Sequence, residues 1–501
     1  MRYHGDGLCQ WDTWCQVAPD GLVHAFYLQQ ARPGGYRTQR DADSLGHAVS
    51  RNLIDWVEQP PVIAPAAPGE PGDLVNWTGS TVQAAAGRYH LFYTMRSSSS
   101  AGRIQAIGSA TSDDLWTWTK NPANPVLTPD GRWYNTEQAP GPNGVVDCRD
   151  LMVVKHPTRP GWFGVFATRV VDEELPRGAV FGGAYSEDLV HWEQTGPVFR
   201  SARDAYSIVE MPDLFELDGR WYLTFLEDNA YGNRDVLGEP ELTSGTRYAV
   251  ADRIEGPYAE PADNVLMASR GFNGISCRTV PFRGRLHVTY TSCERELENE
   301  TKPTFGSLAL PKELRLVDGR PRLCFAEVVR ESVTETLIAA GRQPEPAEHH
   351  GMHESRGRWT SEASGDWRGS IDTAWSRRSF APSADDAIAT VTLRLETGVA
   401  AGLLVRQVGN RGVVALLDAD RQQVSLCTVP RFQVVDARSW PVRRGRDYRL
   451  RVISNGEFLE VFLDDELVLQ CVWYGARRGD VGVLVDRGQA CFRELELLAL
   501  G

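Results

Sequence analysis

Three acidic residues stand in separate short motifs whose neighbours are mostly apolar or aromatic. They are Asp12 in CQWDTWC, Asp150 in CRDLMVV and Glu210 in VEMPDLF, and they lie 138 and 60 residues apart. Breaking a glycosidic bond needs a carboxylic acid to protonate the leaving oxygen, and a carboxylate on the opposite side to attack the anomeric carbon or activate water. A third anion can hold sugar hydroxyl groups. The three acids are therefore candidates for this chemistry, provided that the fold brings them together.

The neighbours of the acids indicate separate roles. Asp12 follows Trp11 and precedes a second tryptophan two positions later, so indole rings could exclude water and give a sugar an apolar platform. Arg149 precedes Asp150 and would keep that carboxylate ionised. Glu210 lies in the apolar segment IVEMP, where partial burial beside two other anions favours the protonated acid. We therefore expect Glu210 to be the proton donor.

The elements that must position these acids are short β-rich runs bounded by Gly, Pro, Asp and Asn. Five runs resemble one another: HAFYLQQ at 24–30, HLFYTMR at 90–96, FGVFATR at 163–169, WYLTFLED at 221–228 and LHVTYTSC at 286–293. Repeats of about 65 residues with such strands indicate a radial array of four-stranded sheets. Five units predict a five-bladed β-propeller. The first strand of each blade lines the axis, so we expect the acids to occupy equivalent innermost positions and converge on one pocket.

A second recurring element accounts for other acids. It reads GHAVSRNLIDW at 46–56, GSATSDDLWTW at 108–118 and AYSEDLVHW at 184–192, with a weaker form at 248–258. Its polar turn contains residues that can bond their own backbone, so we assign turn roles to Asp55, Asp114, Asp188 and Asp252. The segment NWTGS at 76–80 occupies the position in the second repeat that the candidate acids occupy in theirs. We expect it to contact substrate through Trp77 and Ser80.

The composition changes after about residue 335. The stretch QPEPAEHHGMHESRGR at 343–358 is polar and unpatterned, and strands with alternating apolar residues return from about 366 onwards. The prediction is an all-β chain, with a five-bladed β-propeller at 1–335, a linker or crossing segment at 336–365 and a β-sandwich at 366–501. We expect the sandwich to stabilise the propeller; sugar binding is its alternative role.

The bulk composition excludes several classes of function. The net charge of −13 argues against nucleic acid as a partner. The sequence contains no run of 18 apolar residues, so we expect no membrane span. No secretory signal is recognisable, and nine cysteines without close CxxC pairs are typical of reduced thiols, so a cytoplasmic location is expected. The spacing of the histidines in the sequence does not match that of metal ligands. We therefore predict a small saccharide as partner, with no metal and no cofactor, and leave the oligomeric state open.

These motifs resemble those of glycoside hydrolase family 32 and its relatives in clan J, the β-fructosidases. The family has an Asp in WMNDPNG followed by the His of HLFYQ, and Asp12 and His24 have the same spacing of 12 residues. LGHAVSRNLIDW is similar to the family's WGHATSxDLxHW, and Trp77-Thr78-Gly79-Ser80 to its SGS segment. Arg149-Asp150 corresponds to its RDP motif, and Glu210-Met211-Pro212-Asp213 to its EC(P)D motif.

The resemblance implies a propeller followed by a sandwich, and a retaining double displacement on a terminal furanosyl unit, most typically β-fructofuranosyl. Asp12 would be the nucleophile, Asp150 the transition-state stabiliser and Glu210 the acid/base. The sugar would be held by Arg149, Trp77 and Gln29.

The chain also departs from the family pattern. NDPNG has become WDTWC, RDP has become RDL, and Met211 replaces the Cys that follows the catalytic Glu. Three alternatives stay open at this stage. They are a fructosyltransferase, an inverting arabinofuranosidase or xylosidase similar to family 43, and a propeller that binds carbohydrate without cleaving it.

Overall fold

The computed structural model describes residues 3, 8–31, 44–85, 87–141, 144–171, 173, 177–201, 208–228, 244–269, 274–295, 303–345, 347, 357–361 and 366–501. Within these ranges the chain is built from strands and two short 3₁₀ helices, which confirms the predicted all-β class. The chain divides into two compact units, Tyr3–Leu314 and Arg315–Gly501. No helix in the described ranges has the length and apolar character needed to span a membrane.

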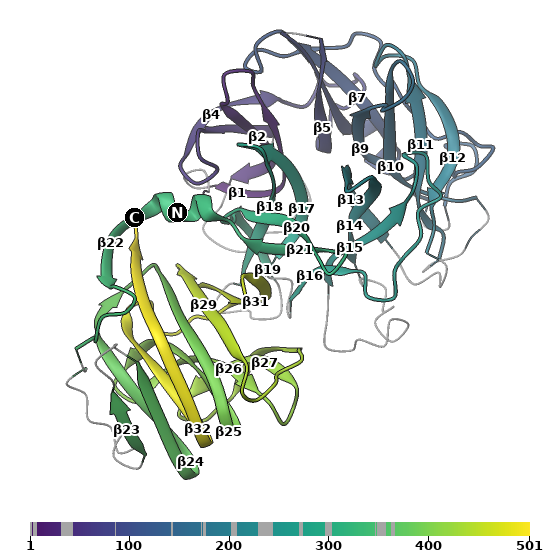
Figure 1. Ribbon diagram of the computed structural model, residues 1–501. Helices are drawn as coiled ribbons and strands as arrows, with labels where there is room; N and C mark the ends of the chain where they lie inside the picture. Colours follow the sequence, from purple (N-terminus) through teal and green to yellow (C-terminus); the bar gives the residue numbers. More distant parts are fainter. Residues whose placement is uncertain are drawn as a thin grey trace. The chain divides into compact units, whose positions relative to one another are not determined.

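Four blades of the first unit are separate antiparallel sheets of four strands, each in sequence order (Figure 1). Blade 1 contains β1 (Leu8–Val17), β2 (Val23–Ala31), β3 (Ser44–Ser50) and β4 (Trp56–Ile63). Blade 2 contains β5 (Val75–Ala85), β6 (Arg88–Arg96), β7 (Gln105–Ser112) and β8 (Thr119–Lys120), with the 3₁₀ helix η1 (Ser98–Ser100) after β6. Blade 3 contains β9 (Cys148–Lys155), β10 (Trp162–Arg169), β11 (Ala179–Ser186) and β12 (Glu193–Phe199). Blade 4 contains β13 (Ile208–Leu217), β14 (Arg220–Asp228), β15 (Ser244–Ala251) and β16 (Val265–Ser269).

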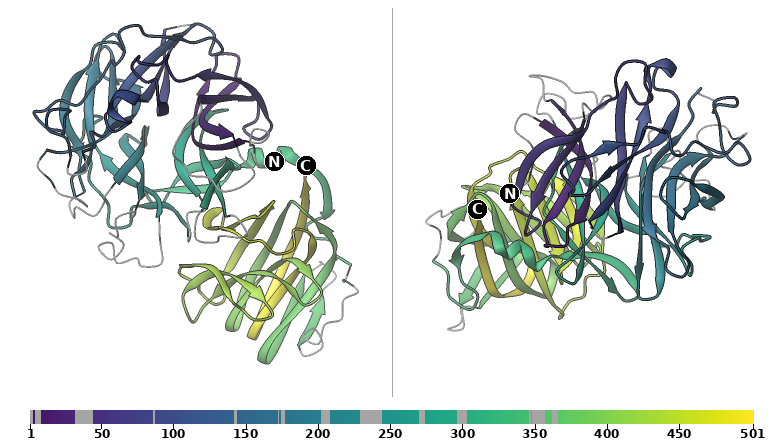
Figure 2. Two further views of the ribbon diagram at one scale, coloured as in Figure 1. Left: turned by 180° about the vertical axis from the view of Figure 1, so that it is seen from behind. Right: turned by 90° about the horizontal axis from the view of Figure 1, so that it is seen from above.

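The fifth blade closes the ring. It begins with β17 (Gly274–Phe282) and β18 (Arg285–Arg295), and β18 pairs with both β19 (Pro303–Leu308) and β20 (Lys312–Val317). The first strands of successive blades contact one another in the order β1, β5, β9, β13, β17 and back to β1. In Figures 1 and 2 these strands face the centre of the propeller and the later strands of each blade lie further out. The predicted five-bladed propeller is confirmed.

Apolar layers between neighbouring blades hold the ring together, and they are made by the aromatic strands that the repeats contain. Phe26, Tyr89 and Tyr93 belong to one buried cluster, and Phe181 and Phe225 belong to another. Burying an aromatic side chain of this kind contributes about 2–3 kcal/mol. The alternating pattern follows because a blade strand presents one face to each neighbouring sheet.

The recurring turn after the third strand is a side-chain-capped turn. Asp114 accepts hydrogen bonds from two following backbone N–H groups, each at 2.8 Å, and Asp188 does the same. The turn roles predicted for these two residues are therefore confirmed. In blade 1 the equivalent acceptor is Asn52, and Asp55 instead accepts a hydrogen bond from the Asn52 side chain at 2.8 Å. The turn role predicted for Asp55 thus belongs to Asn52, three residues earlier in the sequence. Asp252 is an exposed, ion-paired residue.

The second unit is a β-sandwich. After β21 (Arg320–Phe325), the 3₁₀ helix η2 (Glu327–Ser332) and β22 (Val333–Ile338), it contains ten further strands. These are β23 (Arg358–Ser361), β24 (Trp367–Ala384), β25 (Ala387–Val408), β26 (Arg411–Asp418), β27 (Gln423–Val429), β28 (Val434–Ser439), β29 (Asp447–Asn455), β30 (Phe458–Leu463), β31 (Glu466–Val472) and β32 (Gly479–Leu500). β25 pairs with β29, β26 and β32, so the long strands link the two layers around one apolar core.

The division between the units falls earlier than the sequence indicated. It lies at Leu314/Arg315, whereas the predicted propeller ran to 335, so β21, η2 and the start of β22 belong with the sandwich. Much of the predicted segment 336–365 lies outside the described residues. Its described parts include the end of β22 and the whole of β23, which pair with sandwich strands.

Candidate active site

Every innermost strand carries a β-bulge at the same level of the propeller. In each case two residues face one residue of the second strand of the blade. The first residues of the five bulges are, in blade order, Asp12, Thr78, Asp150, Met211 and Ser276. Four of them have positive φ angles, namely 53° for Asp12, 59° for Asp150, 52° for Met211 and 61° for Ser276. Such angles are uncommon for residues other than glycine, and bulges re-aim side chains next to active sites.

Asp12 is held by residues from neighbouring blades. Its Oδ2 accepts a hydrogen bond from Thr78 Oγ1 at 2.6 Å, and its Oδ1 accepts one from Ser276 Oγ at 2.7 Å. Burial raises the pKa of Asp12 to about 6, although these two hydrogen bonds oppose the rise. Asp12 therefore presents a fixed carboxylate that is ionised at neutral pH but is poorly solvated, as a nucleophile requires.

Asp150 has the equivalent bulge position on blade 3. Its backbone N–H donates to Thr94 Oγ1 at 3.0 Å, and its Oδ2 accepts from the backbone N–H of Met211, also at 3.0 Å. Burial raises the pKa of Asp150 to about 7; the Arg149 guanidinium lowers it, and the Glu210 and Asp12 carboxylates raise it further. The mutual influence shows that the three acids share one electrostatic site.

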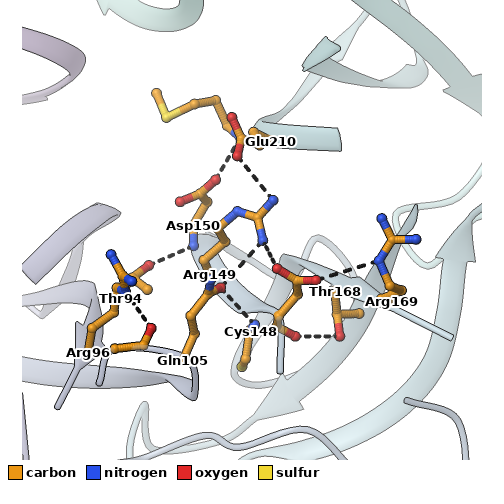
Figure 3. A network of polar contacts seen from close by, with 12 residues as sticks. Thr94, Arg96, Gln105, Cys148, Arg149, Asp150, Thr168, Arg169 and Glu210 are labelled. Atoms are coloured by element: carbon orange, nitrogen blue, oxygen red, sulfur yellow. Dashed lines mark hydrogen bonds and ion pairs between the residues drawn. The ribbon is translucent and has the colours of Figure 1, made fainter. Parts of the chain in front are cut away.

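Arg149 links Glu210 to a second acid (Figure 3). Arg149 Nη2 lies 3.0 Å from Glu210 Oε1, and Arg149 Nη1 lies 2.5 Å from Asp147 Oδ1. Gln105 Oε1 is a further acceptor at 3.4 Å, and Asp147 also forms an ion pair with Arg169 at 3.6 Å. The Arg149 side chain is 9% exposed and the Glu210 side chain 33%. Glu210 is thus partly open to solvent, whereas Arg149 and Asp150 are buried.

We expected the three acids to occupy equivalent positions in their strands. Asp12 and Asp150 do, as first residues of a bulge, whereas Glu210 lies one residue before that position. Glu210 immediately precedes the bulge of its strand, as Arg149 and Trp77 do in theirs. Successive residues of a strand point to opposite sides, so this offset places the Glu210 side chain differently from the two aspartates. The bulge still brings it close enough to pair with Arg149.

The other predicted binding residues divide into two groups. Trp77 is half-buried next to the site, with the Arg96 guanidinium 4.1 Å from its ring centre. Trp11, Gln29 and Ser80 are instead buried, at 3%, 8% and 2% exposure. Trp11 packs in the apolar layer between blades 1 and 2. We therefore correct its predicted role as a sugar platform to a packing role.

The side chains of Ser80 and Gln29 are engaged within the protein. Ser80 Oγ donates to the Leu151 carbonyl at 2.7 Å and accepts from the Val153 N–H at 3.3 Å, which joins blades 2 and 3. Gln29 Nε2 donates to Ser44 Oγ at 2.9 Å. The contact of Ser80 with substrate is corrected to a structural role, since its hydroxyl is already used. The predicted contact of Gln29 with substrate stays a prediction.

Sequence reasoning missed three residues of the site. Thr78 and Ser276 donate to Asp12, and Asp147 holds Arg149. Thr78 and Ser276 could have been found by aligning the segments that precede all five aromatic runs, because both have the phase of Asp12. Asp147 immediately precedes β9 and lies two residues before Arg149, the spacing at which side chains of an extended segment share a side.

No group of three or more His, Cys, Asp or Glu residues in the described part of the chain is arranged to hold a metal ion. What the site offers is acid–base and nucleophilic chemistry from carboxylates, together with a guanidinium that can donate to hydroxyl groups.

The sequence profile described as the glycosyl hydrolases family 32 N-terminal domain matches residues 16–324. The chain belongs to this family. Among solved structures of family 32, the beta-fructofuranosidase of Bombyx mori superposes with a TM-score of 0.68 at 19% identity, covering 98% of this chain and 91% of that chain. Exo-inulinase from Aspergillus awamori gives a TM-score of 0.71 at 16% identity, covering 100% and 97%. These similarities establish the fold.

Curated family relatives match over shorter stretches. The levanase of Bacillus subtilis (strain 168) is 26% identical over 337 residues, which is 63% of this chain and 44% of the levanase. A beta-fructofuranosidase of Zea mays is 34% identical over 87 residues, or 17% of this chain and 13% of the maize protein. The chain thus spans less than two thirds of the length of these relatives. The family match begins after Asp12, so the place of Asp12 in the site rests on β1 and its hydrogen bonds.

Proposed function

We propose that this protein is a retaining glycoside hydrolase that removes a terminal β-fructofuranosyl unit from a small saccharide. The observation that carries the proposal is the convergence of Asp12, Asp150 and Glu210, from three different blades, on one partly desolvated centre. Membership of family 32 and relatives named beta-fructofuranosidase and levanase support the fructosyl substrate.

In the first step, a carboxylate oxygen of Asp12 attacks the anomeric carbon while Glu210 donates a proton to the leaving oxygen. The glycosidic C–O bond breaks and an ester to Asp12 forms. In the second step, Glu210 accepts a proton from water, the water oxygen attacks the same carbon and the ester bond breaks. Asp150 and Arg149 would hold ring hydroxyl groups, and the carboxylates offset the positive charge that develops on the ring.

The hydrogen bonds to Asp12 suit this role. Thr78 and Ser276 approach its two oxygens from blades 2 and 5, so the carboxylate is fixed before the sugar binds. A nucleophile that is already oriented loses little additional entropy in the transition state. Glu210 is more exposed and lies against Arg149, which suits a group that exchanges protons with the leaving group and then with water.

A substrate panel with product stereochemistry tests the proposal. Sucrose, short inulins and levans, and aryl β-fructofuranosides would be compared with aryl arabinofuranosides and xylosides, with Asp12→Ala as the inactive control. We expect fructose release from the fructosides, and in dilute methanol an initial methyl β-fructofuranoside detected by NMR, because two inversions retain configuration.

Each other outcome identifies an alternative. Inverted product or preferential cleavage of arabinofuranosides or xylosides would contradict the proposal and support chemistry similar to that of family 43. Oligosaccharides that grow at the expense of fructose release would identify a transferase. Saturable sugar binding without turnover, unchanged in Asp12→Ala, would identify a binding protein.

We include a cytoplasmic location in the proposal. It is supported by eight of the nine cysteines, those whose side chains the structure describes, all of which are free thiols. Relatives named extracellular exo-inulinase point the other way, so detection of the protein outside the cell would overturn this part of the proposal.

A further inference from the structure

A second layer of residues lies immediately past the bulges. The residue two positions after each bulge residue is, in blade order, Trp14, Ser80, Met152, Asp213 and Arg278. Arg278 is the only cation of this set. It is 2% exposed, and its guanidinium interacts electrostatically with Asp213, Asp150 and Asp12.

The direct contacts of the Arg278 guanidinium are weak. Its Nη1 lies 3.1 Å from the Met152 sulfur, and its Nη2 lies 3.9 Å from the Met211 sulfur and 3.5 Å from the Gly79 carbonyl oxygen. Its Nε has no hydrogen-bond partner among the described residues. Thioether sulfur is a poor acceptor, so these contacts do little to neutralise the charge.

A buried guanidinium without strong local partners is costly unless other charges compensate for it. The charges that act on Arg278 come from three neighbouring strands: Asp12 on β1, Asp150 on β9 and Asp213 on β13. Asp213 Oδ2 is oriented by the Thr279 N–H at 2.6 Å. The charged groups around Arg278 are therefore negative, and this one cation stabilises several carboxylates.

We propose that Arg278 is a positioning residue that supplies an internal positive charge beside the active-site carboxylates and thereby stabilises the ionised forms of Asp12 and Asp150. Arg278 touches no reacting atom in this scheme. Arg149, by contrast, contacts Glu210 directly and lies where it can reach the substrate. The inference deepens the proposed function and rests on it for its kinetic readout, whereas its charge readout is independent of turnover.

The kinetic test compares pH profiles of kcat/KM for Arg278→Met, Arg278→Lys and the wild type between about pH 4.5 and 8.5. Removing an opposite charge raises the pH at which a carboxylate ionises, here by about one unit. We therefore expect Arg278→Met to lose about tenfold more activity at pH 5.5 than at pH 8, and Arg278→Lys to keep the wild-type profile. Arg451→Met, which removes a buried arginine from the sandwich, is the matched control and should not move the profile.

A folded Arg278→Met protein with an unmoved acidic limb would overturn the proposal. If Arg278→Met fails to fold because Asp213 loses its counter-charge, Arg278→Met/Asp213→Asn removes both charges and restores the balance. The acidic limb of this double variant should still move upward, since the cation near Asp12 is gone. An unmoved limb in the double variant would overturn the proposal equally.

The charge readout uses protein labelled with ¹³C at aspartate carboxyl groups, with the Asp12 resonance assigned from its loss in Asp12→Asn. The midpoint of its titration should rise by about one unit in Arg278→Met or in the double variant. An unchanged midpoint would refute the role of Arg278 even if every fructoside were cleaved. A raised midpoint in a protein that cleaves no fructoside would support the role of Arg278 and refute the proposed function.

Discussion

Replacing Asp12 by Asn is expected to abolish activity and to stabilise the propeller at neutral pH. In the folded protein burial raises the pKa of Asp12 from 3.8 to about 6. Because the folded-state pKa is above the unfolded-state value, the contribution of Asp12 to stability is fully present below pH 3.8. It is lost as the pH rises through about 6. The catalytic carboxylate therefore opposes folding in the pH range in which it works.

The size of the effect follows from the shift. A difference of about two pKa units corresponds to about 3 kcal/mol in the free energy of unfolding above pH 7. Asn removes this penalty but weakens the hydrogen bonds from Thr78 and Ser276, at a cost of about 1 kcal/mol. We expect a net stabilisation of about 1–2 kcal/mol at pH 8 and none at pH 4. Loss of the nucleophile should lower kcat at least about a thousandfold.

Calorimetric unfolding at pH 4, 6 and 8 measures the stability of both proteins, and hydrolysis of an aryl β-fructofuranoside measures activity. Asp114→Asn is the matched control, because backbone hydrogen bonds lower the pKa of this exposed carboxyl. Its stabilising contribution is present above the unfolded pKa and lost in acid, so the control variant should be less stable than wild type at pH 8. An Asp12→Asn protein that is less stable than wild type at pH 8, with the same pH dependence, would refute the reasoning.

Three further variants test other parts of the molecule. Ser276→Ala removes a donor to Asp12 and so raises the pKa of that carboxyl; kcat/KM should fall several-fold at pH 5.5 and little at pH 8, and equal losses would contradict this. Glu210→Gln should lower kcat/KM at least about a hundredfold for sucrose and less for an aryl fructoside with a good leaving group, whereas a uniform loss would contradict its role as acid. Burial lowers the pKa of His24 to about 4 and that of its neighbour His47 to about 3, so wild-type stability should fall as the pH drops below 6.5. Urea midpoints at pH 7 and 5 should differ less in His47→Gln than in wild type; an equal difference would count against these histidines.

The blades were predictable because packing between neighbouring sheets requires a recognisable pattern of side chains. A strand between two sheets needs aromatic and β-branched residues on both faces, and runs such as those at 24–30 and 90–96 show this pattern plainly. The end of the propeller was not predictable in this way. The boundary at Leu314/Arg315 falls inside β20, so no turn or change of pattern in the sequence marks the change of unit.

The site was predictable in its residue types and less so in its geometry. Asp12 and Asp150 were placed correctly in phase because both are first residues of a bulge. A bulge leaves no mark on the apolar pattern, so the sequence does not show that the bulge of β13 begins one residue after Glu210. Trp11 precedes the bulge of its strand, as Glu210 does, but its side chain is buried in an apolar cluster. Its aromatic character was therefore ambiguous between sugar binding and packing.

The balance of charge at the centre links the two layers of the site. Four carboxylates and two guanidiniums interact there: Asp12, Asp150, Glu210 and Asp213 with Arg149 and Arg278. Glu210 is protonated when it acts as the acid, so 3 − 2 leaves one net negative charge. A neutral sugar gains little from this field, but a ring that develops positive charge at the transition state gains much more, and only such differential stabilisation accelerates the reaction. Complete neutralisation of the carboxylates would remove that advantage, and without the two cations the buried aspartates would take up protons instead. An intermediate number of arginines is therefore the arrangement in which the nucleophile is ionised and the developing charge on the sugar is still stabilised.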